Sequence, residues 1–142
     1  MNISKHFTIQ EFVYPELYNQ WGDKSIYFLD QRIVNVAEFI REKINKPITI
    51  NNWHTGGQYK ESGLRSLNTS TGGALSQHKF GRAADLKVQG MTPAQVLQFI
   101  KDNWAELHAL GLTTVEDIAM TPTWLHIDVR WTGLSELLIV KP

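Results

Sequence analysis

Apolar residues between positions 25 and 45 recur at intervals of three and four, with polar residues between them. This spacing places them on one face of an α-helix and predicts the longest helix of the chain. The apolar positions are Leu29, Ile33, Val36, Ile40 and Ile44. We expect the helix to end before Pro47, because proline cannot continue it, and to support a sheet packed against it.

Two further helices are predicted from the residues that start them. Thr8 and Glu11 have the spacing of a capping box, which opens a short helix. Pro15 is expected to interrupt or kink the chain after it. Thr92 is a good N-cap, and Pro93 suits the first position of a later helix. The apolar residues of that later helix are Val96, Leu97, Ile100 and Trp104.

Runs of β-branched and alternating residues predict the strands of a sheet. These runs are 48–50, 86–88, 113–119, 124–130 and 137–140, with a tight turn between the third and the fourth. Because the links between consecutive strands are short, we expect a mainly antiparallel sheet. The pattern predicts an α+β fold in which residues 1–142 form a single domain, with a central sheet flanked by helices.

Length and charge exclude several classes of protein. The 142 residues suffice for one domain with one sizeable core. The 14 basic and 14 acidic side chains give no net charge and form no run of one sign, which argues against binding to a nucleic-acid backbone. No stretch reaches the length of a membrane span, and no apolar signal-peptide core follows Met1. We expect a monomer that is made in the cytoplasm of a cell or host cell and is not inserted into a membrane.

Candidate chemistry is concentrated in residues 76–85, which read Ser-Gln-His-Lys-Phe-Gly-Arg-Ala-Ala-Asp. His78 and Asp85 are seven residues apart, and Gly81 between them allows the backbone to turn sharply. A second imidazole, His126, is available later in the chain. Two imidazoles and one carboxylate are a known ligand set for catalytic zinc, and the chain has no cysteine to offer thiolate ligands. On spacing alone, a hydrogen-bonded His–Asp pair in a polar turn is an equally good interpretation.

The pattern Ser76-x-His78-x-x-Gly81-x-Ala83-x-Asp85 resembles the signature of the D-alanyl-D-alanine carboxypeptidase group of zinc peptidases. These enzymes belong to the wider lysostaphin, D-Ala-D-Ala and hedgehog-type fold. The chain is most similar to the small, often phage-borne branch that cuts peptidoglycan stem peptides. Five further segments resemble that branch and occur in the expected order: 7–12, 47–53, 62–65, 72–74 and 126–130.

The resemblance implies a zinc ion (Zn²⁺) held by His78, Asp85 and His126, with a fourth position left for water. Zinc lowers the pKa of such a water and polarises the scissile carbonyl. In this family an arginine upstream of the signature helps to bind substrate. Arg65 is the best-placed candidate, and its guanidinium would hold a substrate carboxylate. Ser76 is expected to hydrogen-bond within its loop or to the substrate.

The general base is the point at which this chain departs from the family pattern. Many relatives have an acidic residue three positions before the last histidine ligand, and others have a histidine two positions before it. This chain has Thr123 and Trp124 at those positions. The base must therefore come from another part of the chain, or activity is lost.

Strand pairing offers replacements for the missing base. If a tight turn joins the third and fourth strands, Asp117 lies opposite His126 on the same face of the sheet, within reach of the water. We therefore expect Asp117 to be the catalytic base. Glu116 would point the other way unless the register slips by one residue. Asp128 is better suited to orienting a metal ligand from behind or to pairing with an arginine. Both remain alternatives.

Two functions are compatible with these residues. The first is a zinc-dependent metallopeptidase that hydrolyses an amide bond in peptidoglycan stem peptides, as a carboxypeptidase or an endopeptidase. It would resemble a phage endolysin, which acts on the bacterial cell wall or in the periplasm after release. The second is a non-catalytic zinc-binding module of the same fold, which binds cell wall or forms part of a virion. Thr123 at the usual position of the base keeps the second function open.

Overall fold

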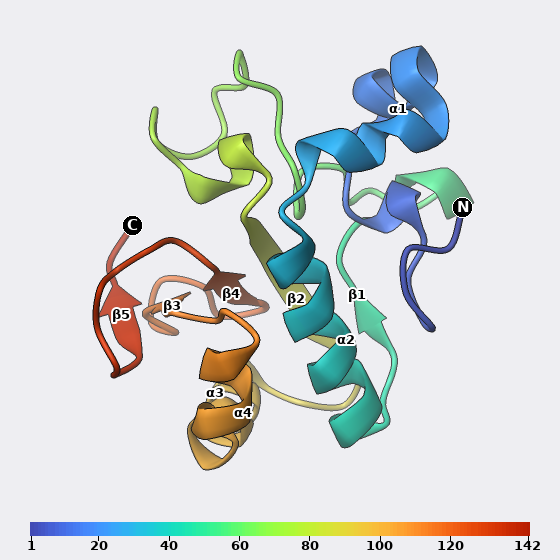
Figure 1. The fold of residues 1–142 in the computed structure, drawn as a ribbon. Helices are drawn as coiled ribbons and strands as arrows, with labels where there is room; N and C mark the ends of the chain where they lie inside the picture. Colours follow the sequence, from blue (N-terminus) through green and yellow to red (C-terminus); the bar gives the residue numbers. More distant parts are fainter.

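A five-stranded sheet crosses the centre of the protein in a computed structural model that describes all 142 residues (Figure 1). The order of its strands is β1-β2-β4-β3-β5. Their bounds are Ile48–Thr49 (β1), Ala83–Val88 (β2), Thr114–Glu116 (β3), Leu125–Asp128 (β4) and Leu138–Val140 (β5). The first four pair antiparallel in that order, and β5 pairs in parallel with β3. The prediction of an α+β fold with a mainly antiparallel sheet is therefore confirmed.

The longest helix, α2 (Gln31–Ile44), covers one face of the sheet (Figure 1). Its N-cap is Asp30, whose carboxylate accepts a hydrogen bond of 3.0 Å from the Arg32 backbone N–H. The helix ends at Asn45, which has a left-handed conformation with a φ of 55°. Its buried residues are Ile33, Val34, Val36, Ala37 and Ile40. The predicted apolar positions Ile33, Val36 and Ile40 thus lie on the face by which α2 packs against the core, although the helix begins later than predicted.

The two faces of the sheet differ because side chains alternate along each strand. One face belongs to the hydrophobic core that also contains residues of α2, α3 (Pro93–Asp102) and α4 (Trp104–Ala109). The sheet contributes Ile48, Ala84, Leu86, Val88, Val115, Leu125 and Ile127 to that core. Asp85 and His126 lie between these residues in the sequence, so their side chains point to the other face. The helices therefore cover one face and leave the opposite face for polar chemistry.

The N-terminal part of the chain corrects two predictions. Pro15 does not interrupt the chain but occupies the first position of α1 (Pro15–Trp21), where its missing N–H costs no hydrogen bond. The chain then continues as a 3-10 helix over Gly22–Phe28, which is why α2 starts only at Gln31. The capping box of Thr8 is confirmed, but it opens a single 3-10 turn, Ile9–Glu11.

The start of α3 agrees with its prediction. Thr92 accepts a hydrogen bond of 3.2 Å from the Gln95 backbone N–H, and the Gln95 side chain accepts one of 2.9 Å from the Thr92 backbone N–H. Pro93 occupies the first turn. The helix stops at Asp102, so Trp104 belongs to α4. No helix of the protein combines the length and the apolar character that crossing a membrane requires.

A long connection between β1 and β2 crosses the polar side of the sheet and contains two short 3-10 helices, Trp53–Thr55 and Gln77–Phe80. Two hydrogen bonds hold this connection in place. The buried Asn51 side chain accepts a hydrogen bond from the Ser62 N–H at 2.8 Å, and the Arg65 N–H donates to the His78 carbonyl oxygen at 3.0 Å. This connection therefore holds the 3-10 helix that carries His78 against β2.

Candidate metal centre

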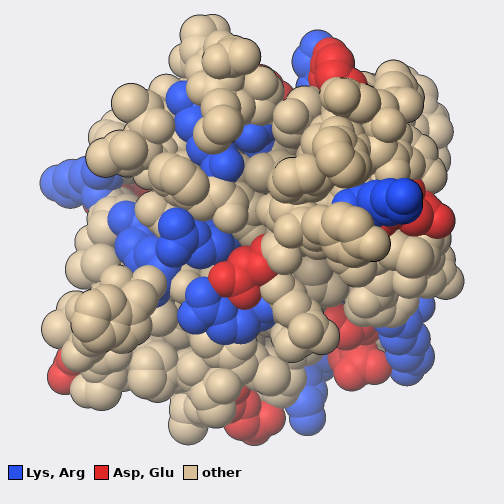
Figure 2. Space-filling model, turned by 45° about the horizontal axis from the view of Figure 1, so that its top comes forward, with Lys and Arg blue, Asp and Glu red and all other residues tan.

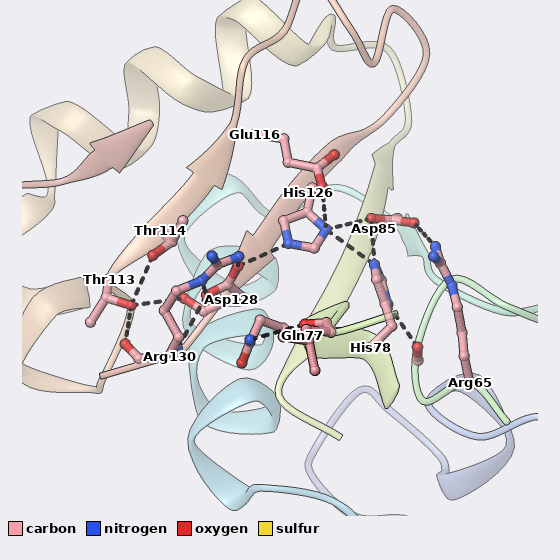
Figure 3. Close-up of polar contacts among 12 residues, drawn as sticks. Arg65, Gln77, His78, Asp85, Thr113, Thr114, Glu116, His126, Asp128 and Arg130 are labelled. Atoms are coloured by element: carbon pink, nitrogen blue, oxygen red, sulfur yellow. Dashed lines mark hydrogen bonds and ion pairs between the residues drawn. The ribbon is translucent and has the colours of Figure 1, made fainter. Parts of the chain in front are cut away.

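Three side chains predicted as ligands meet on the polar face of the sheet: His78, Asp85 and His126 (Figure 3). Their relative exposures are only 2%, 6% and 2%. His78 Nε2 lies 3.1 Å from Asp85 Oδ1, His126 Nδ1 lies 3.0 Å from the same oxygen, and the two nitrogens are 3.1 Å apart. Three polar atoms from segments far apart in sequence thus form a nearly equilateral triangle.

The elements that carry these residues explain the convergence. Asp85 of β2 and His126 of β4 are directly paired across the sheet, so their side chains leave the same face next to each other. His78 belongs to the 3-10 helix Gln77–Phe80, which Gly81 ends with a positive φ of 68°. A side chain at Gly81 would collide with the carbonyl oxygen of Phe28. The glycine therefore lets the chain fold back sharply, which brings His78 over the strand.

The outer nitrogens of both imidazoles are held by hydrogen-bond acceptors. His78 Nδ1 donates to the carbonyl oxygen of Gly63 at 2.8 Å, and His126 Nε2 donates to Asp128 Oδ2 at 3.0 Å. With these protons fixed outside, each neutral ring turns a lone pair inward. When both rings are neutral, two lone pairs and a carboxylate oxygen face one another without a donor between them. Such a set is suited to a cation.

Asp128 is itself held in place, as expected for a group that orients a ligand. It is fully buried, and Arg130 donates to its two oxygens from Nε at 2.8 Å and from Nη2 at 2.6 Å. This two-pronged contact fixes the plane of the carboxylate. Burial opposes the charged form of Asp128, but the hydrogen bonds from His126 and Arg130 outweigh it and lower the pKa of Asp128. Asp128 thus stays ionised behind His126.

The charges of the three central groups are strongly coupled. Burial opposes the charged form of each, but the neighbouring His78 and His126 hold the pKa of Asp85 far below its usual range. For His126 burial is outweighed by hydrogen bonds to Asp128 and Asp85, which raise its pKa to about 9. Burial lowers the pKa of His78. The metal-free centre therefore keeps one proton on His126, which a divalent cation would displace.

The residues fit a zinc ion in number, chemistry and spacing. Ligand atoms at 2.0–2.1 Å from a tetrahedral zinc are about 3.3 Å apart, close to the 3.0–3.1 Å found here. Two nitrogens and one oxygen leave a fourth coordination place, the arrangement of catalytic sites. Oxygen and nitrogen donors also accept other first-row divalent ions, so the donor set favours zinc without selecting it alone.

The triangle opens into a cleft of about 560 Å³. Its walls come from the connection before β2, from the segment around β3 and β4, and from the residues after β5. The lining side chains outside the triangle include Arg65, Ser76, Glu116, Trp124, Arg130 and Lys141. A substrate in this cleft would therefore meet charged groups on both sides of the metal position.

Arg65 lies in the cleft but is already engaged. Its Nη2 donates to Asp85 Oδ2 at 3.0 Å, and its Nε donates to the carbonyl oxygen of Glu61. Two of its three guanidinium nitrogens therefore brace the candidate metal ligand, rather than projecting freely toward a substrate carboxylate. Ser76 precedes the 3-10 helix of His78 as its N-cap residue, and its side chain makes no capping hydrogen bond and lines the cleft.

The register of β3 and β4 differs from the one expected. Thr114 pairs with Asp128 and Val115 with Ile127, so Glu116 is the next residue in line and faces His126. Glu116 Oε1 lies 3.8 Å from His126 Nδ1, and the side chain lines the cleft. The predicted pairing of Asp117 with His126 is wrong by one residue.

Asp117 lies beyond the end of β3, and its carboxylate accepts a hydrogen bond of 3.0 Å from the Ala119 N–H. It does not line the cleft. The predicted strands 113–119 and 124–130 end at Glu116 and begin at Leu125, so a longer link replaces the tight turn that fixed the expected count. Counting from the buried Val115, whose neighbours must face the other side, would have selected Glu116.

Two contributors to the centre escape sequence reasoning. The carbonyl oxygen of Gly63 orients His78, but any residue has such an oxygen, so no side-chain signal exists for it. Lys141 lines the cleft only because β5 returns beside β3. Neither contact follows from spacing within the motif.

The family model described as Peptidase M15 matches residues 5–128. The chain therefore belongs to the Peptidase M15 family, the zinc peptidases of D-Ala-D-Ala carboxypeptidase type that its signature resembles. The matched region includes all three residues of the triangle and ends at Asp128. No curated protein and no solved structure gives a significant match.

Proposed function

We propose that this chain is a zinc-dependent peptidase that hydrolyses an amide bond in the stem peptides of peptidoglycan. Membership of the family indicates a metallopeptidase acting on peptidoglycan. The observation that carries the finer proposal is the triangle of His78, Asp85 and His126, which has an inward-facing donor set and an adjoining cleft. When bound there, a zinc ion supplies the Lewis acidity that polarises a carbonyl and acidifies a water.

Glu116 is the general base in this proposal. Its carboxylate lies beside the inward nitrogen of His126, on the open side of the triangle. From there it can take a proton from the attacking water and pass it to the leaving amine. Asp117 lacks this position, because its carboxylate is engaged by its own loop. Glu116 thus fills the role left vacant by Thr123.

The remaining charged residues hold the reacting groups in place. Arg65 fixes the second oxygen of Asp85, and Arg130 fixes Asp128, which in turn orients His126. Because of these contacts, the candidate metal ligands already have the orientation that the reaction requires. The resemblance to small phage-borne enzymes favours an endolysin that meets the bacterial wall after release.

The test compares wild type, Glu116→Gln and Asp117→Asn on purified peptidoglycan, with zinc content measured for each protein. Wild type should release new amino groups, and mass spectrometry of the muropeptides identifies the bond. Glu116→Gln should retain zinc and lose about 10²- to 10⁴-fold in rate. Asp117→Asn, the matched control, should keep its rate.

Each opposite result has a definite meaning. An active Glu116→Gln together with an inactive Asp117→Asn would return the base to Asp117. Wild type that binds zinc but leaves peptidoglycan intact would favour the non-catalytic module, the function that Thr123 kept open. Glu116 beside the metal position argues against that alternative.

A further inference from the structure

Residues 67–75, which we call the cleft loop, form one wall of the cleft beside the candidate metal centre. The loop projects away from the sheet, between Arg65 and the 3-10 helix of His78 (Figure 1). The N–H groups of Gly72 and Gly73 donate no hydrogen bond within the protein, so they are available to the backbone of a peptide in the cleft. The residues of the loop that line the cleft are Thr71, Gly72, Gly73 and Leu75.

The cleft loop lacks two of the usual means by which a protein holds a loop in place. All of its residues except Thr69 are exposed, and Leu67 and Leu75 are 69% and 78% exposed, so burial of apolar side chains does not anchor it. Charged side chains, which gather near the middle of one face in Figure 2, are absent from the loop, so no ion pair can hold it. Its position therefore depends on hydrogen bonds.

Both oxygens of the Glu61 carboxylate accept hydrogen bonds from this loop. Thr69 Oγ1 donates to Oε1 at 2.5 Å, and Thr71 Oγ1 donates to Oε2 at 2.7 Å. Thr69 Oγ1 also accepts a hydrogen bond of 3.2 Å from the Thr71 N–H, which joins the two threonines. All other hydrogen bonds of the cleft loop go to residues of the loop itself or to residues that adjoin it in the sequence. Glu61 is thus the only partner that ties the loop to a more distant part of the chain.

Glu61 also connects the cleft loop to the metal centre through the backbone. Its carbonyl oxygen accepts a hydrogen bond from Arg65 Nε, and Arg65 in turn donates to Asp85 Oδ2. The next residue, Ser62, accepts a hydrogen bond of 2.7 Å from the Asp85 N–H through its carbonyl oxygen. The loop also passes close to the arginine, since a Cβ at Gly72 would lie 2.9 Å from Arg65 Nη1. The place of the loop is therefore set relative to a candidate metal ligand.

We propose that Glu61 is a positioning residue for the peptidase, whose carboxylate holds the cleft loop where a stem peptide can bind between the loop and the metal centre. The inference rests on the proposed function and adds a residue that determines the affinity for substrate. Glu61 does not line the cleft, so it acts through the loop rather than on the substrate. Without this clamp the substrate would have to order the loop at each binding event, and part of the binding energy would be lost.

The test uses the zinc-loaded full chain and a synthetic stem peptide that contains the bond identified in the muropeptides. Glu61→Ala should raise KM about three- to ten-fold, because it removes two hydrogen bonds to a carboxylate, and should change kcat and zinc affinity by less than about two-fold. The double variant Thr69→Val with Thr71→Val should raise KM by a similar factor. Adding Glu61→Ala to the double variant should have no further effect, because all three changes break the same clamp.

Glu106→Ala is the matched control for Glu61→Ala. It removes an exposed carboxylate of α4 that makes no hydrogen bond, and it should behave as wild type in every assay.

Cleavage by chymotrypsin measures the position of the loop without relying on peptidase activity. Chymotrypsin cleaves after leucine, and Leu67 and Leu75 offer two exposed sites in the loop. Cleavage at these sites, identified from the masses of the fragments, should be faster in Glu61→Ala and in the threonine double variant than in wild type, because a released loop fits a protease more readily.

An unchanged KM in Glu61→Ala, or additive effects of the Glu61 and threonine changes, would overturn the positioning role while wild type remained active. A joint fall of kcat and zinc affinity would also overturn it, since Glu61 would then act on the metal centre rather than on the loop. Unchanged cleavage by chymotrypsin would overturn the clamp itself. A wild-type protein that cleaves neither the peptide nor peptidoglycan would overturn the proposed function and the effect on KM with it, so the wild-type rate distinguishes the two failures.

Discussion

Asp128 illustrates how a residue outside the cleft can control the metal centre. It is fully buried, accepts the outer proton of His126 and is clamped by Arg130. As long as it is ionised, it keeps the proton on Nε2, so that Nδ1 presents its lone pair to the metal position. The availability of one of the two nitrogen donors therefore depends on a carboxylate that never meets the metal.

We predict that Asp128→Asn lowers zinc affinity by about 10- to 100-fold, because the amide weakens the hold on the His126 tautomer and leaves Arg130 without its anion. Competition with a chromophoric chelator measures the affinity. Asp102→Asn at the exposed end of α3 is the matched control and should bind zinc as wild type does. An unchanged affinity in Asp128→Asn would show that His126 needs no such partner.

At the scale of elements, the decisive feature is the turn between the 3-10 helix of His78 and β2. Gly81 has a φ of 68°, and its carbonyl oxygen accepts a hydrogen bond of 3.0 Å from the Asp30 N–H. The backbone of Phe28 occupies the space in which a side chain at Gly81 would lie. The turn thus couples the metal centre to the entrance of α2.

Gly81→Ala should therefore destabilise the protein by more than the ~1–2 kcal/mol of a left-handed alanine, since the collision with Phe28 adds to it. It should also weaken zinc binding by displacing His78. Thermal unfolding and zinc titration measure the two effects. Gly73→Ala is the matched control, because a side chain there meets no atom within 4 Å. Equal stability of the two variants would contradict the role of the turn.

At the scale of the whole molecule, the metal centre joins the connection between β1 and β2, which carries His78, to strands β2 and β4. A metal ion and a proton on His126 compete for the same place in this centre, so both affect the stability of the fold. In the metal-free protein His126 has a pKa of about 9, above its ordinary 6.5. A raised folded-state pKa contributes stability that is fully present below about pH 6.5 and is lost as the pH rises toward 9. Burial lowers the pKa of Lys87 to about 8, which acts in the opposite sense only above that pH.

We expect the chelator-treated protein to lose stability between about pH 7 and 8, because in this window the raised pKa of His126 dominates the change in proton binding on folding. The lowered pKa of His78 acts in the opposite sense, mainly below about pH 7. Unfolding by urea at a series of pH values measures the effect. Zinc-loaded protein should be more stable and should not show the fall, because the ion replaces the proton. A rise in stability of the metal-free protein over the same window would refute the proton on His126.

Much of this organisation can be predicted from the sequence because it depends on local rules. The periodicity of α2, the N-cap Thr92 and the strand over residues 86–88 follow from spacing and propensity, although β2 begins earlier, at Ala83. The prediction at Pro15 is wrong because proline can either end a helix or occupy its first turn, and the residues that follow it decide which occurs. The predicted register of β3 and β4 is wrong by one residue because it assumes a tight turn, whereas a longer link joins Glu116 to Leu125.

The sequence by itself determined the family, the fold class and the three side chains of the triangle, since these depend on residue identity and on a motif with fixed spacing. Only the tertiary structure decided which carboxylate faces His126, that Arg65 braces Asp85, and that Lys141 reaches the cleft. The physical reason is that a strand offers its two faces alternately. A shift of one residue, set by contacts far away in the chain, exchanges the side chain in the site for its neighbour.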